Sequence, residues 1–215
     1  YQVDQPRALA VQGDIAYLVH ANGLVVLDVS VSPPAAILTT TQPWDAADAL
    51  ICEDALYIAD RSGAIWALDL QNPRQPAVAG RWPQQALGLA CGADFLLAAA
   101  GSQGLYIASL KDPLRPEQVG WFASDDARAV AVAGELGYLA DARTGVHVLD
   151  LQNPAAPVEL ASLATAGSPQ AIVADGRRVY VADGAGGLVI CDMDSISEGT
   201  QCVPVATFAT DGSAL

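Results

Sequence analysis

Short apolar runs alternate with polar or glycine-containing turns along the whole chain. The runs are rich in β-branched and aromatic residues, and Gly, Pro, Asn and Asp interrupt them. No stretch sustains the 3.6-residue spacing of apolar positions that is typical of an amphipathic helix. The pattern therefore predicts an all-β protein made of short strands.

One apolar phrase recurs along the chain, with a tyrosine at its start and usually an aspartate at its end. Its copies are Tyr17-Leu-Val-His20, Tyr57-Ile-Ala-Asp60, the degraded Leu97-Ala-Ala-Ala100, Tyr138-Leu-Ala-Asp141 and Tyr180-Val-Ala-Asp183. A second phrase follows each copy after a turn of small residues. It ends at Asp28, Asp69, Ser109, Asp150 and Asp192, which are 41, 40, 41 and 42 residues apart. The chain is therefore a tandem array of five repeats.

Each repeat divides into four short strands: an apolar run, the two recurring phrases, and a run after a turn that is marked by proline in three repeats. Four strands in about 40 residues are typical of a β-propeller blade. We therefore predict a five-bladed β-propeller that forms a single domain over residues 1–215. The predicted repeats are approximately 5–45, 46–84, 85–125, 126–167 and 168–210. The chain opens and closes at the same phase of the repeat, as either a closed ring or a piece of a longer array would.

The best copy of the two phrases is Tyr180-Val-Ala-Asp-Gly184 followed by Leu188-Val-Ile-Cys-Asp192. In these phrases the sequence resembles the LVIVD-repeat family. The resemblance covers essentially the entire chain and implies a secreted or surface-attached bacterial or archaeal protein. It implies no catalytic residues for this sequence. The sequence departs from the family pattern at His20, Ala100 and Ser109.

The recurrent aspartates and tyrosines predict a role in building each blade. Aspartate side chains at the ends of strands accept hydrogen bonds from turn amides. The tyrosines are expected to pack between blades, with their hydroxyls reaching the edge. A residue that recurs in every blade is expected to serve the folding of each blade. We therefore expect functional residues at positions where one repeat differs from the others.

The loops that lead into the first strands and those that join the second and third strands lie on one face of a propeller. On that face Arg7, Arg128 and Gln170 are candidates for holding a carboxylate or another anion at the axial mouth. The alternative is local pairing of the arginines with Asp4, Asp125 or Asp126. Candidate partner-binding residues on the same face are Trp44, Trp82, His20, Arg61 and Arg143.

The net charge of the chain and the motifs that it lacks argue against several classes of function. The 24 acidic and 10 basic side chains give a net charge of −14, which argues against nucleic acid and anionic membranes as partners. No apolar segment is long enough to span a membrane. Nucleophile-elbow, metal-binding and phosphate-binding motifs are absent, and the repeat alignment places all five glutamates away from the axial mouth. A glycosidase or lyase, which would need paired carboxylates there, is the weakest reading.

These observations predict a non-enzymatic interaction or scaffold propeller, without cofactor or metal, that binds a protein or extracellular polymer through its loop face. It is expected to insert into no membrane and to be either complete or part of a larger chain or assembly. The alternative is a lectin-like propeller that binds a small ligand or a glycan at the axial mouth.

The four cysteines predict the cellular compartment. Cys191 and Cys202 flank the enlarged turn of the last repeat, where a hairpin base suits a disulfide. Cys52 and Cys91 occupy first strands in registers one residue apart, and we expect both to be unbridged buried thiols. A bridged pair favours an oxidising, extracellular or cell-surface location.

Overall fold

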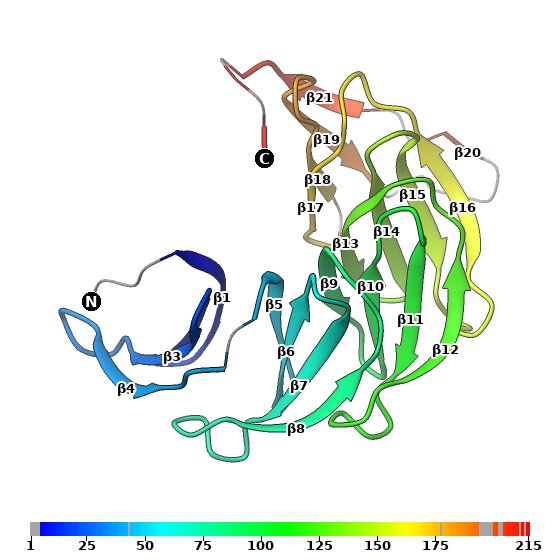
Figure 1. The fold of residues 1–215 in the computed structure, drawn as a ribbon. Coiled ribbons are helices and arrows are strands. Elements are labelled where there is room, and N and C mark those ends of the chain that lie inside the picture. Colours follow the sequence, from blue (N-terminus) through cyan, green and yellow to red (C-terminus); the bar gives the residue numbers. More distant parts are fainter. Residues whose placement is uncertain are drawn as a thin grey trace. The chain divides into compact units, whose positions relative to one another are not determined.

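The computed structural model of the chain describes residues 5–42, 44–176, 178–193, 200–201, 204–210, 212 and 214–215. The described residues form strands and turns without a helix (Figure 1). The strands assemble into five sheets, and in each sheet four strands lie side by side in the order of the chain. Each of these four-stranded sheets falls within one predicted repeat, so the predicted all-β architecture is confirmed.

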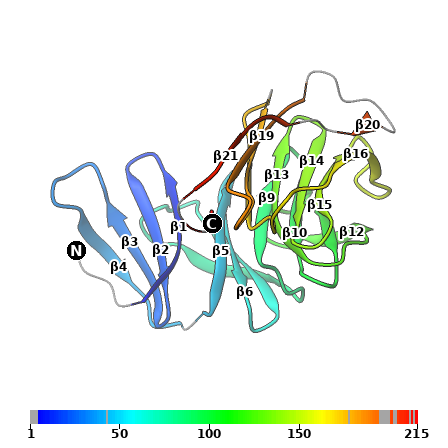
Figure 2. The same ribbon diagram turned by 90° about the horizontal axis from the view of Figure 1, so that it is seen from above.

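The chain forms two compact units, of which the first contains two complete sheets. This unit comprises the residues up to Leu87 together with Leu110–Glu117. Its first sheet is the first blade, with strands β1 (Pro6–Gln12), β2 (Ile15–His20), β3 (Gly23–Asp28) and β4 (Ala35–Thr39). Its second sheet is the second blade, with strands β5 (Ala46–Cys52), β6 (Ala55–Asp60), β7 (Ala64–Asp69) and β8 (Ala77–Trp82). Figure 2 shows β1 to β4 in this order.

The second unit comprises Gly88–Ser109 and the residues from Gln118 onward, and it carries the third, fourth and fifth blades. The third blade has strands β9 (Gly88–Cys91), β10 (Phe95–Ala99), β11 (Leu105–Ser109) and β12 (Glu117–Phe122). The fourth has β13 (Ala127–Ala133), β14 (Leu136–Asp141), β15 (Gly145–Asp150) and β16 (Val158–Leu163). The fifth has β17 (Ala171–Ala174), β18 (Arg178–Ala182), β19 (Leu188–Asp192) and β21 (Pro204–Phe208).

A two-residue strand departs from the four-strand pattern. β20 (Thr200–Gln201) comes from the enlarged turn of the last repeat and pairs in parallel with β16 at the edge of the fourth blade. The enlarged turn of the last repeat thus adds a fifth strand to the sheet of the fourth blade.

The middle strands of the blades are buried on both faces, whereas the fourth strands are largely exposed. All six residues of β6 and all five of β10 are buried, but only one residue of β8 is. A strand directs alternate side chains to opposite faces of its sheet, so complete burial means that both faces of these strands are covered. The core lies between blades: Tyr17 and Val26 of the first blade pack in one cluster with Leu56 and Ile58 of the second.

Two tyrosines of the first recurring phrase join neighbouring repeats, as the sequence predicts, whereas the Tyr180 hydroxyl bonds within its own repeat. The Tyr17 hydroxyl donates a hydrogen bond to the Pro73 carbonyl oxygen at 2.9 Å, and the Tyr57 hydroxyl donates to the Pro113 carbonyl oxygen at 2.6 Å. Both tyrosines are fully buried. Burial, together with the negative charges of Glu53 and Asp112, raises the pKa of Tyr57 above its usual value, so its hydroxyl keeps the proton that it donates.

We expect Tyr57→Phe to lower the free energy of unfolding by about 1–2 kcal/mol, because it leaves the Pro113 carbonyl without its donor. Urea denaturation measures the change. The control is Tyr180→Phe, whose exposed hydroxyl donates to Asp175 at 3.2 Å and whose loss should cost less than about 0.5 kcal/mol. Equal effects of the two substitutions would contradict the role assigned to Tyr57.

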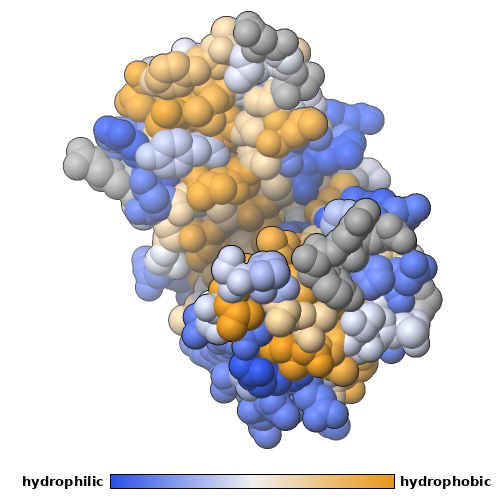
Figure 3. Space-filling view, turned by 90° about the vertical axis from the view of Figure 1, so that its left-hand side faces the viewer, coloured by the Kyte–Doolittle hydropathy of each residue, from blue (hydrophilic) through white to orange (hydrophobic). Residues whose placement is uncertain are grey.

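Apolar side chains also reach the surface (Figure 3). In the first unit Leu9 is 58% exposed, although Ala49, which holds the same position in the second blade, is only 9% exposed. The second unit exposes Trp121, Val173 and Phe208. Among the described residues there is no helix with the length and apolar character needed to cross a membrane.

Candidate functional site

In each of four blades, the loop that leads into the first strand contacts the turn that joins the second and third strands. The Arg61 amide donates to the Asp45 carbonyl oxygen at 3.0 Å, and the Ala142 amide donates to the Asp126 carbonyl oxygen at 2.9 Å. In the first blade the Ala21 amide donates to the Gln5 carbonyl oxygen at 3.4 Å, and in the fifth blade the Ser168 amide of the leading loop donates to the Asp183 carbonyl oxygen at 3.2 Å. We call the surface that these loops and turns form within each unit the loop face.

A buried aspartate at the end of the second strand holds these loops in place. Asp141 accepts hydrogen bonds from the Ser124 hydroxyl and the Asp125 and Asp126 amides of the leading loop. It also accepts the amides of Arg143 and Thr144 from the turn, at 2.7 and 3.0 Å. This carboxylate therefore fixes both halves of the loop face in the fourth blade. The structural role that the sequence predicts for the recurrent aspartates is confirmed.

Burial alone would raise the pKa of Asp141, but the hydrogen bonds from Ser124, Asp126, Arg143 and Thr144 outweigh burial and hold the pKa well below its usual range. Asp60 of the second blade behaves in the same way. Burial raises its pKa, but donors that include the Ser62 amide and hydroxyl and the Trp66 indole outweigh burial, so the pKa of Asp60 lies below its usual value. Both carboxylates are therefore ionised at neutral pH.

The fifth blade uses glycines around its aspartate. Asp183 is fully buried and accepts the Gly167 amide at 2.8 Å. A Cβ atom on Gly186 would lie 2.0 Å from Oδ2 of Asp183, so only glycine fits there. The Gly-rich turn of the last repeat thus makes room for the carboxylate.

In the first blade His20 takes the place of the aspartate. It ends β2 rather than lying in the turn, and its Nδ1 accepts the Asn22 amide at 3.4 Å. The residue is only 9% exposed, and its Nε2 is buried without a hydrogen-bond partner. This burial is the reason why His20 is not the exposed partner-binding residue that its position in the sequence predicts.

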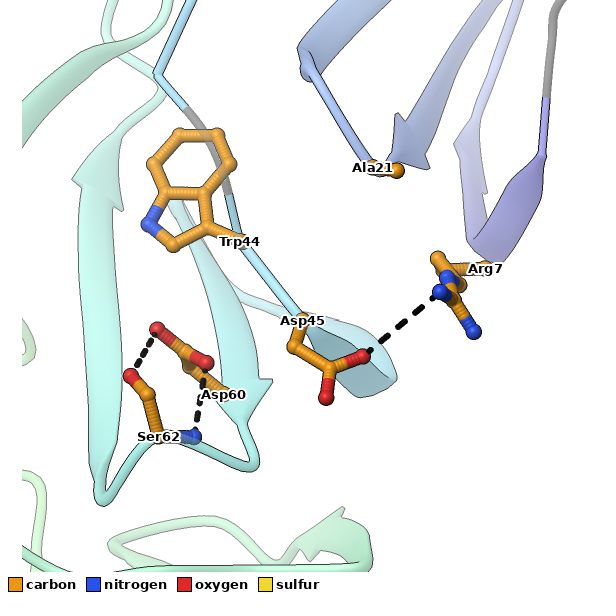
Figure 4. A pocket seen from close by; sticks show the side chains of 6 residues that line it. All are labelled: Arg7, Ala21, Trp44, Asp45, Asp60 and Ser62. Carbon is orange, nitrogen blue, oxygen red and sulfur yellow. Dashed lines mark hydrogen bonds and ion pairs between the residues drawn. The ribbon is translucent and has the colours of Figure 1, made fainter.

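A pocket of about 340 Å³ opens on the loop face of the first unit (Figure 4). It is lined by Arg7, Ala21, Trp44, Asp45, Asp60 and Ser62. Arg7 comes from β1, Trp44 and Asp45 from the loop that leads into β5, and Asp60 and Ser62 from the end of β6 and the turn after it. No sequence motif marks Asp45 or Ser62 as a binding residue, although the repeat register places both in loops of this face.

Two guanidinium groups share one carboxylate at the rim of the pocket. Oδ1 of Asp45 lies 3.4 Å from Nη1 of Arg61 and 3.9 Å from Nη2 of Arg7. Nη1 of Arg61 also donates to the Ala46 carbonyl oxygen at 2.8 Å. The three charged side chains are 41–54% exposed, and ion pairs of this kind contribute little to stability. Arg7 and Arg61 together carry one positive charge more than Asp45, the ionised Asp60 in the pocket lining offsets it, and both guanidinium groups are exposed enough for an incoming group to reach.

Trp44 and Trp82 are not the exposed partner-binding residues that the sequence predicts. They are only 3% and 4% exposed. Trp44 packs in the apolar cluster between the first two blades, and its indole Nε1 is buried without a hydrogen-bond partner. The predicted role is wrong because the leading loop directs this indole into the core.

The remaining predicted residues of the loop face belong to the second unit. Nη2 of Arg128 lies 2.8 Å from Oδ2 of Asp126, and the side-chain amide of Gln170 donates from Nε2 to the Ser168 carbonyl oxygen at 3.0 Å. Arg128 thus has the local partner that the sequence offered as the alternative to an anion site. Arg143 is exposed, and its backbone amide is held by Asp141.

The cysteines differ from the prediction. Cys52 and Cys91 are both disulfide-bonded, and the expectation of unbridged thiols is wrong. The expectation rested on strand register alone, and register does not determine whether a cysteine is bonded. Cys191 is buried, and Cys202 lies outside the described residues, so the bridge between them stays a prediction.

The LVIVD repeat model matches residues 6–38, 124–165 and 166–208, which together make up more than half of the chain. The chain belongs to the LVIVD-repeat family. None of the curated proteins compared with this LVIVD-repeat chain matches it.

Solved structures show the fold of this LVIVD-repeat protein. The computationally designed Ika8 protein aligns with a TM-score of 0.72 and 12% identity, over 97% of this chain and 69% of that one. Hsv2 of Kluyveromyces lactis aligns with a TM-score of 0.64 and 14% identity, over 95% of this chain and 64% of that one. A form of KlHsv2 with loop 6CD replaced by a Gly-Ser linker aligns with a TM-score of 0.65 and 14% identity, over 98% of this chain and 68% of that one.

The LVIVD-repeat chain spans about two thirds of the length of these propeller-like structures. Sequence identities of 12–14% show a shared fold and nothing further about function. With five four-stranded antiparallel sheets, the fold is a five-bladed β-propeller.

Proposed function

We propose that this chain is a non-enzymatic interaction module that binds a protein or an extracellular polymer through the loop face of its first unit. The observation that carries the proposal is the pocket whose rim holds Arg7 and Arg61 around the single carboxylate of Asp45. A carboxylate of the partner can replace Asp45 in its contact with either guanidinium group, because the present ion pairs are half exposed and weak.

The floor of the pocket supports binding rather than chemistry. Asp60 receives the Ser62 amide at 2.9 Å and the Ser62 hydroxyl at 2.7 Å, and its pKa lies below the usual value. A glycosidase needs one carboxylic acid that keeps its proton near neutral pH. Asp60 is ionised and already bonded, so it supplies a rigid negative floor instead of a proton.

The disulfide-bonded state of Cys52 and Cys91 supports an extracellular or cell-surface location. Disulfides form and persist in oxidising compartments and are rare where glutathione keeps thiols reduced. A partner on the outside of the cell follows from that location. The net charge of −14 makes a polyanion an unfavourable partner over most of the surface and leaves the arginine rim as the place for isolated carboxylates.

The test compares Arg7→Ala/Arg61→Ala with the wild type on a panel of immobilised extracellular proteins and carboxylate-bearing polysaccharides. We expect at least one member to bind the wild type and to bind the double variant at least tenfold more weakly, which corresponds to about 1.4 kcal/mol. Biolayer interferometry at two salt concentrations measures the affinities.

The matched control is Arg74→Ala. Arg74 also forms an ion pair, with Asp28 at 2.8 Å, but it lies in the turn after the third strand rather than on the loop face. Its loss should leave binding unchanged. An equal loss of affinity in the double variant and in Arg74→Ala would refute the proposed site. An affinity that the double substitution leaves unchanged would refute it as well.

A further inference from the structure

A second group of side chains in the fourth blade has the connectivity of an activated hydroxyl. The Thr144 Oγ1 lies 2.7 Å from Nε2 of His147, and Nδ1 of the same ring lies 2.7 Å from Oε1 of Glu159. Thr144 is exposed at the tip of the turn between β14 and β15, and the His147 side chain is only 14% exposed. The hydroxyl is therefore accessible while the imidazole behind it is shielded.

The partners fix the proton positions on the neutral ring. An ionised carboxylate only accepts hydrogen bonds, so Nδ1 of His147 carries the hydrogen and donates it to Glu159. Nε2 is then the lone-pair nitrogen, and the Thr144 hydroxyl donates to it. A hydroxyl that donates to an imidazole oriented by a carboxylate is the arrangement by which proteins activate a hydroxyl nucleophile.

Rigid elements hold this group in place. The turn that carries Thr144 is fixed by Asp141, which accepts the Arg143 and Thr144 amides. The ring of His147 packs against Phe122, with centroids 5.8 Å apart. Glu159 lies on β16, which is paired with the strand that carries His147. Preorganisation of this kind is what a reactive hydroxyl requires.

Comparison of the blades shows what is special about the fourth. The position of His147 is held by Trp66 in the second blade and Tyr106 in the third, and these side chains also bond back to their own turns, at Asp60 and Gln103. A ring that braces the turn is thus a recurring feature. Only the imidazole of the fourth blade can take up a proton.

We propose that Thr144 is an acyl-acceptor site, with His147 as general base and Glu159 as the positioning residue, whose substrate is an activated ester. Oγ1 of Thr144 attacks the carbonyl carbon while its proton passes to Nε2 of His147. The bond from the carbonyl carbon to the leaving oxygen breaks, and that oxygen takes the proton from Nε2. The chain is left as the threonine ester, and the ring returns to its starting state.

The surroundings limit the reaction to reactive acyl donors. The amides of Arg143 and Thr144, the nearest candidates to stabilise an oxyanion, are both committed to Asp141. One acyl group is transferred per chain, so the site is one of covalent modification and is independent of the binding role proposed above.

The probe is p-nitrophenyl acetate. We expect the wild type to release about one equivalent of p-nitrophenolate and to gain one acetyl group, which peptide mass spectrometry places on Thr144. Thr144→Ala should abolish this adduct. His147→Gln should slow its formation about 100-fold, the contribution of a general base. Glu159→Ala should also slow it, and Glu159→Gln, which keeps an acceptor for Nδ1–H, should restore part of the rate.

The control variant is Thr41→Ala, because Thr41 is an exposed hydroxyl of the first unit. It should acetylate at Thr144 like the wild type. Circular dichroism establishes that every variant is folded. An adduct missing from the folded wild type, an adduct on another residue, or a rate that His147→Gln leaves unchanged would overturn the proposal.

Discussion

Asp141→Ala is expected to lower the free energy of unfolding by about 4 kcal/mol. The substitution leaves the Ser124 hydroxyl and the amides of Asp125, Asp126, Arg143 and Thr144 without their shared acceptor. Buried donors that lose their acceptor cost more than the hydrogen bonds contribute, because water does not replace the partner. Chemical denaturation followed by tryptophan fluorescence measures the loss.

The matched control for Asp141→Ala is Asp150→Ala in the same blade. Asp150 ends the third strand and accepts the Gln152 amide at 2.8 Å near the surface, so its loss should cost about 1 kcal/mol or less. Similar losses at the two positions would contradict the account of the buried aspartate.

Acid gives a second readout of the same carboxylate. The folded-state pKa of Asp141 lies below its unfolded value near 3.9, so its stabilisation is complete above that value and is lost as the pH falls through the folded-state pKa. The stability difference between wild type and Asp141→Ala should therefore begin to shrink as the pH falls below about 4 and should be clearly smaller at pH 2 than at pH 7. A stability difference that stays constant down to pH 2 would show that the hydrogen bonds do not depend on the ionised carboxylate.

Reduction of the disulfide is the other change with a large expected effect. Loss of the bonds at Cys52 and Cys91 should lower the free energy of unfolding by about 2–5 kcal/mol, because a cross-link restricts the unfolded chain. Thermal unfolding with and without dithiothreitol measures the effect.

The control for reduction is the double variant Cys52→Ser/Cys91→Ser. If these two cysteines hold the chain's disulfide, the reductant should leave the melting temperature of this variant unchanged. A further drop on reduction would reveal the bridge predicted between Cys191 and Cys202. If dithiothreitol leaves the melting temperature of the wild type unchanged, the stabilising role of the bonded cysteines is contradicted.

The repeat was enough to predict the strands, because turn residues and apolar runs recur in every unit. The same reasoning gave the role of Asp141, since an aspartate at the end of a strand next to a turn finds amide donors wherever the blade folds. These predictions depend only on contacts within one repeat or between equivalent positions of neighbouring repeats.

The side-chain directions of individual loop residues did not follow from the repeat. Trp44 lies on the predicted loop but turns into the core, and His20 is buried at the end of its strand. The pairing of Thr144 with His147 and Glu159 joins a turn, the third strand and the fourth strand, and a β-bulge between Val148 and Leu149 shifts the register of the last two. A sequence pattern with a fixed period does not contain such a shift.

The central claim is that each repeat forms its own four-stranded sheet in one common register. Cross-strand nuclear Overhauser contacts test it most directly. We expect contacts between the facing residues Ala49 and Ile58, Val130 and Leu139, and Ile172 and Val181, which hold one position in three repeats. Strand pairs out of phase with the repeat, or contacts in only one of the three, would contradict it.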